Sequence, residues 1–174
     1  MDDRAVVELQ LDRPTRSAVH VESTCHLGLP VVVDVPPILD DGTPFPTTHW
    51  LTCPLASVRI ARLEAAGGVK AADRDIERDS ALAEAWDEAM ERYRQQRDDR
   101  VPTDWDGPKP TGGIAGSNRG VKCLHAQYAD TRVGNMNPIG ARVAREVEPL
   151  DCSVPCVILD DGQLARNPDW IEPR

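Results

Sequence analysis

Apolar residues recur along this chain with two different spacings, and each spacing predicts one type of secondary structure. Short, partly alternating runs that are rich in β-branched residues occupy positions 5–11 and 17–22, which is typical of strands. A third apolar run covers 29–35, and a last one covers 156–159. We therefore expect a small mixed sheet in which the 156–159 strand joins the three N-terminal strands.

The other apolar positions follow a helical spacing. Pro54 suits the first turn of a helix that Gly67-Gly68 would end. The longest helix is predicted at about 80–97, and two shorter ones at 121–129 and 139–146. One face of the longest helix carries its large apolar side chains, namely Leu82, Trp86, Ala89, Met90 and Tyr93. Such a face is most simply core or an interface.

Length and composition place these elements in one domain. A chain of 174 residues can bury a single core of ordinary size. Its 15 prolines and 12 glycines, with only 4% aromatic residues, predict short elements and much irregular backbone. We expect one loop-rich α+β domain over residues 1–174, with three or four helices packed on the sheet.

The charge of the chain limits its partners. A formal net charge of -9 argues against binding to a nucleic-acid backbone, which requires clustered Lys and Arg. No run of about 18 apolar residues and no signal-peptide pattern occurs, so we expect a cytoplasmic protein that does not bind membranes. In a reducing cytosol, five cysteines are more typical of metal ligands or reactive thiols than of disulfides.

The five cysteines and four histidines mostly lie beside turns, where the backbone can bend toward an ion. Thiolate and imidazole are the ligands that zinc prefers. The paired C-x-x-C spacing of zinc ribbons is absent, so a site would have to be assembled from distant segments. The leading set is Cys25, Cys53, Cys123 and His125, with Cys156 and His49 in reserve. Whether such a zinc ion is structural or catalytic depends on whether water completes its shell.

An iron–sulfur cluster is an alternative cofactor. It would use four thiolates, from Cys25, Cys53, Cys123 and Cys156. The dense cysteine spacing of ferredoxin-like chains is absent, which favours zinc.

A thiol-dependent enzyme is an alternative function. Cys53 and Cys123 each stand at the start of a predicted helix, where unpaired N–H groups and the helix dipole stabilise a thiolate. His125 or His49 would then act as the base, and Asp130 or Asp34 would orient it.

A glycine-rich loop offers a separate anion site. The loop 112–120 leads into a predicted helix, and glycines allow close backbone approach to a small anionic ligand. Its candidate residues are Gly116, Arg119, Gly120 and Lys122. The loop matches neither the P-loop nor the dinucleotide-binding pattern.

Several short motifs together resemble a known family. They are Cys25 with 28–32, then 41–47, 51–54, Leu63-Glu64, 121–125 and 137–140. Their order over about residues 5–158 resembles an uncharacterised, chiefly actinobacterial family, domain of unknown function five hundred and one, with 160–174 as a C-terminal tail. The resemblance implies no activity. It implies a cytoplasmic protein, and a genomic link to a septum-formation protein and an exopolyphosphatase.

The resemblance also ranks the candidate ligands. It retains Cys25, Cys53, Cys123 and His125, and it keeps Cys156 as a possible ligand. It weakens the cases for His26, His49 and Cys152. The gene neighbourhood adds a third class of function, a non-enzymatic adaptor linked to cell division or phosphate metabolism, which would use the apolar face of the 80–97 helix.

Overall fold

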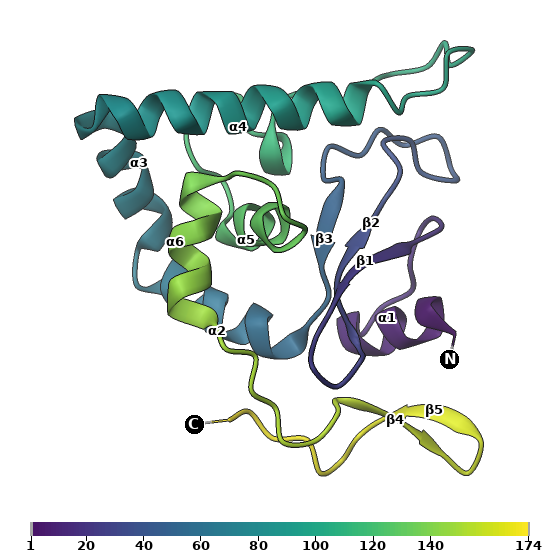
Figure 1. Cartoon of the computed structure of the whole chain (residues 1–174). Helices are drawn as coiled ribbons and strands as arrows, with labels where there is room; N and C mark the ends of the chain where they lie inside the picture. The colour runs from purple at the N-terminus through teal and green to yellow at the C-terminus, as the bar shows by residue number, and fades with distance from the viewer. Residues whose placement is uncertain (1, 174) are drawn as a thin grey trace.

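Two small antiparallel sheets and six α-helices make up the fold that the computed structural model describes for residues 2–173 (Figure 1). In chain order the elements are α1 (Asp3–Leu11), β1 (His20–Thr24), β2 (Pro30–Asp34), β3 (His49–Leu51), α2 (Pro54–Ala65), α3 (Gly68–Arg78), α4 (Ser80–Asp98), the 3-10 helix η1 (Ile114–Gly116), α5 (Leu124–Arg132), α6 (Pro138–Val147), β4 (Val157–Asp160) and β5 (Gln163–Arg166). The predicted α+β class is confirmed. Helix α4 runs along one side of the molecule and the β4–β5 hairpin along the opposite side (Figure 1).

The first sheet has the order β1-β2-β3, and its central strand is covered on both faces. Successive strand residues point to opposite faces, and Val32 and Val33 are both fully buried. Val32 packs into the main helical core, whereas Val33 packs with Val7 of α1. The sheet therefore lies between α1 and the helical body, which explains the continuous apolar run at 29–35.

Three strand predictions require correction. Residues 5–11 form most of helix α1, which Asp2 caps by accepting from the backbone N–H groups of Arg4 and Ala5. A short apolar run does not by itself distinguish a strand from a buried helix. Here the N-cap hydrogen bonds of Asp2 stabilise the helical conformation. The run at 17–22 becomes a strand only from His20.

The C-terminal strand is the third correction. It forms at β4, but it pairs with β5 in a hairpin of its own and does not join the N-terminal sheet. Both sheets are antiparallel, so the predicted mixed sheet is wrong in this detail. The hairpin packs on α1, where Val6 and Val157 share a small core.

The helices α2, α4 and α6 begin where the sequence predicts, and α5 covers most of its predicted range. The residues that the structure describes form six α-helices rather than the expected three or four, because α1 and α3 were not predicted. Gly67 has a positive φ of 88°, and this left-handed residue ends α2 and lets α3 begin at once. Strand β3 was also missed, because it is only three residues long.

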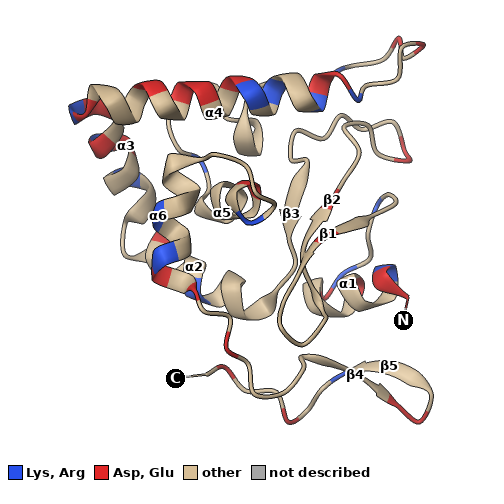
Figure 2. Ribbon diagram, in the orientation of Figure 1, with Lys and Arg blue, Asp and Glu red and all other residues tan. Residues whose placement is uncertain are grey.

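The apolar face of α4 lies in the core. Leu82, Trp86, Met90 and Tyr93 are each at most 8% exposed and belong to the main core cluster. This face is therefore not available to a partner, which removes the surface that the adaptor hypothesis would use. On the outside of α4, acidic and basic residues are interspersed (Figure 2).

A buried polar network joins α4, α5 and α6. The Asp130 side chain is fully buried and accepts hydrogen bonds from Arg92 Nη2 at 2.6 Å, Asn135 Nδ2 at 2.9 Å and Asn137 Nδ2 at 3.1 Å. Asn137 also caps α6 by accepting from the N–H of Gly140 at 2.8 Å. The network fixes the position of α5, whose N-terminal end carries two candidate site residues.

Within residues 2–173 the structure contains no helix whose length and hydrophobicity would allow it to span a bilayer.

Candidate metal centre

Helices α2 and α5 meet so that a carboxylate of one caps the other. Cys123 is the N-cap residue of α5, but its side chain makes no capping hydrogen bond. Glu64, in the last turn of α2, takes this role: its Oε1 accepts from the backbone N–H of Leu124 at 2.6 Å. A free helix N-terminus attracts a carboxylate, so this contact places Glu64 beside Cys123 and His125.

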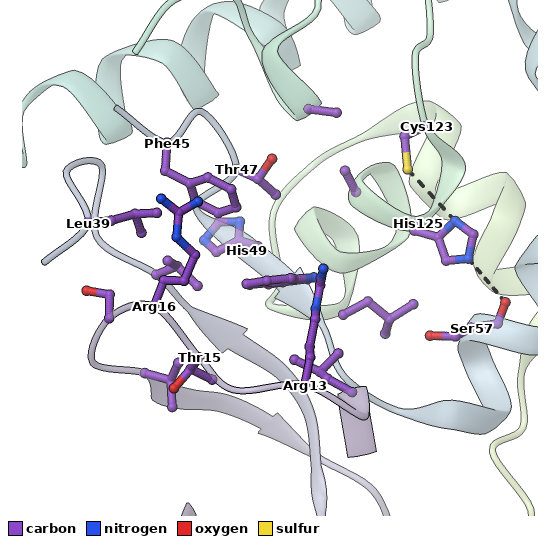
Figure 3. Close-up of a pocket in the computed structure, with 18 residues that line it drawn as sticks. Arg13, Thr15, Arg16, Leu39, Phe45, Thr47, His49, Ser57, Cys123 and His125 are labelled. Atoms are coloured by element: carbon purple, nitrogen blue, oxygen red, sulfur yellow. Dashed lines mark hydrogen bonds between the residues drawn. The ribbon is translucent and has the colours of Figure 1, made fainter. Parts of the chain in front are cut away.

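Glu64, Cys123 and His125 form a compact group, called here the Glu64–Cys123–His125 triad. His125 Nδ1 lies 3.2 Å from Glu64 Oε1 and 3.8 Å from Cys123 Sγ (Figure 3 shows the latter contact). Within residues 2–173 this is the one group in which three such ligand atoms all lie within 4.8 Å of one another. The triad could therefore hold a metal ion.

The other ring nitrogen of His125 is anchored to the backbone. His125 Nε2 lies 3.1 Å from the carbonyl oxygen of Ser57, near the start of α2, and donates to it (Figure 3). A carbonyl partner of this kind fixes the tautomer and orientation of a metal-binding histidine. It leaves Nδ1 directed at the sulfur and the carboxylate.

The contacts of His125 favour its charged form. The hydrogen bond with Cys123 raises the pKa of His125 to about 9, and the charge of Glu64 and the Ser57 carbonyl act in the same direction, against the effect of burial. A metal ion at Nδ1 would therefore have to displace a proton at neutral pH.

The raised pKa of His125 predicts how the stability of the metal-free protein depends on pH. The folded pKa exceeds the unfolded value of 6.5, so this group stabilises the fold fully below pH 6.5 and progressively less as the pH rises to about 9. We expect the urea midpoint of metal-free protein to fall over this window, and a His125→Gln variant to lose this part of the slope. Equal slopes in the two proteins would contradict the assigned contacts.

Two residues of the triad open onto a large cavity. Its volume is about 520 Å³, and Cys123 and His125 line it together with Arg13, Arg16 and His49 (Figure 3). Much of the remaining wall is apolar, including Leu11, Val19, Val35, Leu39, Phe45 and Trp50. Such a mixture of an apolar wall and a few polar groups is typical of small-molecule sites.

The two arginines of the cavity differ in their partners. Arg16 forms a salt bridge with Asp41. The Arg13 guanidinium stacks 4.5 Å from the centre of the Trp50 ring, and within residues 2–173 it forms no salt bridge. Arg13 therefore provides a positive charge that no carboxylate of the described chain neutralises.

The structure divides the quartet that the sequence suggested. Cys123 and His125 lie together with Glu64, whereas Cys25 and Cys53 line a different, small cavity with Cys152 and Cys156. The proposed iron–sulfur quartet is divided in the same way, because Cys123 does not line that cavity. All five cysteines are free thiols.

The other candidates of the thiol-dependent enzyme agree with the structure only in part, because His49 does lie beside Asp130, as a base beside its orienting acid would. Cys53 does cap α2, but burial raises its pKa to about 12, which does not suit a nucleophile. His49 lies beside the buried Asp130, with Nδ1 3.3 Å from Oδ1, and Asp34 pairs with Arg100. Neither aspartate therefore orients His125. The carboxylate that contacts its ring is that of Glu64.

Sequence reasoning did not identify Glu64 as a ligand. Glu64 appears in the sequence analysis only as part of the Leu63-Glu64 motif that resembles the family. No spacing links it to a residue some 60 positions later, because the contact depends on how α2 packs against α5.

The anion-binding loop remains a prediction. The N–H of Val121, which follows Gly120, donates to Asp73 Oδ1 at 2.6 Å, and a side chain at Gly120 would collide with the same carboxylate. Gly116 packs against Pro46. The backbone N–H groups of Val121 and Leu124, at the end of this loop and the start of α5, thus donate to carboxylates of the protein itself.

The fold and the triad together define a small α+β protein with a potential metal-ligand group beside a cavity. Over residues 21–145 the chain matches the family described as protein of unknown function (DUF501), and it belongs to that family. All three triad residues lie within the matched range, whereas Cys152 and Cys156 lie beyond it. No curated protein and no solved structure matches the chain.

Proposed function

We propose that this is a zinc protein whose metal ion is bound by Glu64, Cys123 and His125 at the edge of the large cavity. The observation that carries the proposal is the convergence of three different ligand atoms within 4.8 Å. Carboxylate oxygen, thiolate sulfur and imidazole nitrogen are all ligands of zinc. The proposal replaces the sequence-based quartet by a set in which only Cys123 and His125 are retained.

Three protein ligands suit a zinc ion with an open position. Structural zinc sites are closed by four protein ligands, whereas catalytic sites have three and leave the fourth to water or substrate. Cys123 and His125 line the cavity, so a molecule bound there would have access to the ion. A zinc-bound water would be acidified, which is the chemistry such an ion supplies.

The cavity favours a small anionic ligand with an apolar portion. Arg13 supplies a charge without a described acidic partner, and its stacking on Trp50 holds the guanidinium in place. The apolar wall around Phe45 and Leu39 would accept the rest of such a ligand. We place this function in the cytoplasm, because the thiolate of Cys123 must stay reduced.

A thiol-dependent enzyme is the second candidate function. Its specific support is the contact of Cys123 with His125, in which a thiolate and an imidazolium would stabilise each other. Cys123 stands at the N-terminus of α5, as the sequence suggested, and Glu64 would orient the histidine.

Zinc affinity tests the proposed centre. We expect a His125→Gln or Glu64→Gln substitution to weaken zinc binding at the triad by about 100-fold or more, because even partners outside the ligand shell are worth 10–100-fold. Competition with a chromophoric chelator measures this affinity. His20→Gln, on the exposed surface of β1, is the matched control and should bind as the unmodified protein does.

The same proteins separate the two candidate functions. Unchanged zinc affinity in both ligand variants would exclude the triad as the binding site. If Cys123 were in addition alkylated rapidly in the unmodified protein, and more slowly in His125→Gln whether or not zinc is present, the thiol-dependent enzyme would be favoured instead.

A further inference from the structure

Four of the five cysteines surround one small cavity on the side of the protein where the C-terminal segment crosses the domain. Cys25 lies in the turn between β1 and β2, Cys53 caps α2, and Cys152 and Cys156 lie between α6 and β4. The triad is not part of this cavity. We call it the four-cysteine cavity.

The wall of the four-cysteine cavity is otherwise mostly apolar. It contains Leu27, Leu29, Pro30, Pro54, Leu150 and Pro155, with Gln10 as its one other polar side chain. Among the described residues, no acidic or basic side chain lines this cavity. The only groups there that could bind a cation through charge are the four sulfur atoms, as thiolates.

Polar N–H groups point at the sulfur atoms. The Trp170 indole Nε1 donates to Cys152 Sγ at 3.3 Å, and Gln10 Nε2 donates to Cys156 Sγ at 3.6 Å. A neutral thiol is a weak acceptor, whereas N–H···S hydrogen bonds are typical of metal-bound thiolates.

We propose that Cys25, Cys53, Cys152 and Cys156 form a second metal site, which binds one thiophilic cation, with zinc as the probe, through four thiolates. The cavity has a volume of about 10 Å³, close to one water-sized sphere, which suits one ion better than a polynuclear cluster. The four residues come from three distant segments, so the bound ion would fasten the segment between α6 and β4 to the N-terminal sheet and to α2.

Binding requires the four sulfur atoms to move closer together. No three of these four sulfurs meet the 4.8 Å spacing that the triad satisfies within residues 2–173, whereas zinc–sulfur bonds of about 2.3 Å need a tighter shell. Cys152 and Cys156 lie on a loop that Arg59 supports through the carbonyl oxygens of Val147 and Pro149. We expect this loop to move toward Cys25 and Cys53, and four protons to leave as the thiols bind the ion.

Differential alkylation of the unmodified protein tests this site without any substitution. Metal-free and zinc-loaded protein would each be treated with iodoacetamide, and the rate at each cysteine read by mass spectrometry. We expect zinc to slow modification of Cys25, Cys152 and Cys156 by at least about ten-fold, since a bound thiolate is no longer a free nucleophile. Cys53 is buried in either state and serves as the slow reference.

The four-cysteine site and the triad can fail separately in this experiment. If zinc protected Cys123 alone, the four-cysteine site would be overturned and the triad would stand. If zinc protected Cys25, Cys152 and Cys156 but not Cys123, the triad would be overturned and the four-cysteine site would stand. A Cys152→Ser/Cys156→Ser protein should lose one of two bound zinc ions per chain, whereas a Cys123→Ser/His125→Gln protein should keep one. Brown protein with acid-labile sulfide would overturn the assignment of a single ion.

Discussion

An Asp130→Ala substitution is expected to lower the free energy of unfolding by about 3–5 kcal/mol, the range found when one partner of a buried ion pair is removed. The Asp130 side chain is fully buried and accepts from Arg92, Asn135 and Asn137. Removing it leaves the Asn135 amide without its acceptor, whereas Asn137 still donates to Gln127 Oε1. It also leaves the Arg92 guanidinium, only 25% exposed, without its counter-charge.

Chemical denaturation measures this loss, and α4 provides a matched control. Asp87 lies on the exposed side of α4 and enters no salt bridge or side-chain hydrogen bond of the described residues. We expect Asp87→Ala to change stability by no more than about 0.5 kcal/mol. A loss for Asp130→Ala as small as that of Asp87→Ala would show that the network does not hold α4, α5 and α6 together.

A Gly140→Ala substitution is expected to cost about 3 kcal/mol, at the upper end of the range for overpacking. An added Cβ at Gly140 would lie 2.1 Å from both the Gln127 carbonyl oxygen and Thr131 Oγ1. The first of these atoms is backbone, so α5 and α6 would have to move apart. In a helix, alanine is more stable than glycine by about 1 kcal/mol. A measured loss of stability would therefore have to come from the collision of the added Cβ.

A second substitution separates the two collisions. Thr131→Ala removes the hydroxyl but leaves the Gln127 carbonyl in place. We therefore expect Thr131→Ala to restore only part of the stability of Gly140→Ala, as measured by thermal or urea unfolding. Complete rescue would mean that glycine is required at position 140 because of the Thr131 side chain and not because of the close backbone packing of α5 on α6.

Helices with strong local signals were predictable from the sequence. Pro54 and Pro138 each occupy the first position of a helix, where a missing N–H costs nothing, and both helices begin there. Asp79 caps α4 in the same local way. Short or ambiguous signals are less reliable: the apolar run at 5–11 predicts a strand where helix α1 forms, and no sequence pattern indicates β5, the hairpin partner of β4.

The candidate sites were only half predictable, for a physical reason. Cys123 and His125 are neighbours on one helix turn, so their spacing predicts contact, but Glu64 reaches them only through the packing of α2 on α5. Cys152 similarly lines one cavity with Cys25 only because the C-terminal segment crosses the domain. Sequence patterns report local geometry, and both sites depend on tertiary contacts between distant segments.

The ligand set of the zinc ion is the central claim, and X-ray absorption at the zinc edge tests it most directly. The sample would be Cys152→Ser/Cys156→Ser protein loaded with one zinc ion per chain, so that the four-cysteine cavity cannot contribute four thiolates. The account predicts one sulfur ligand at about 2.3 Å, with nitrogen and oxygen ligands at about 2.0–2.2 Å completing the shell. A shell without sulfur, or one with two or more sulfur atoms, would contradict a centre built from Glu64, Cys123 and His125.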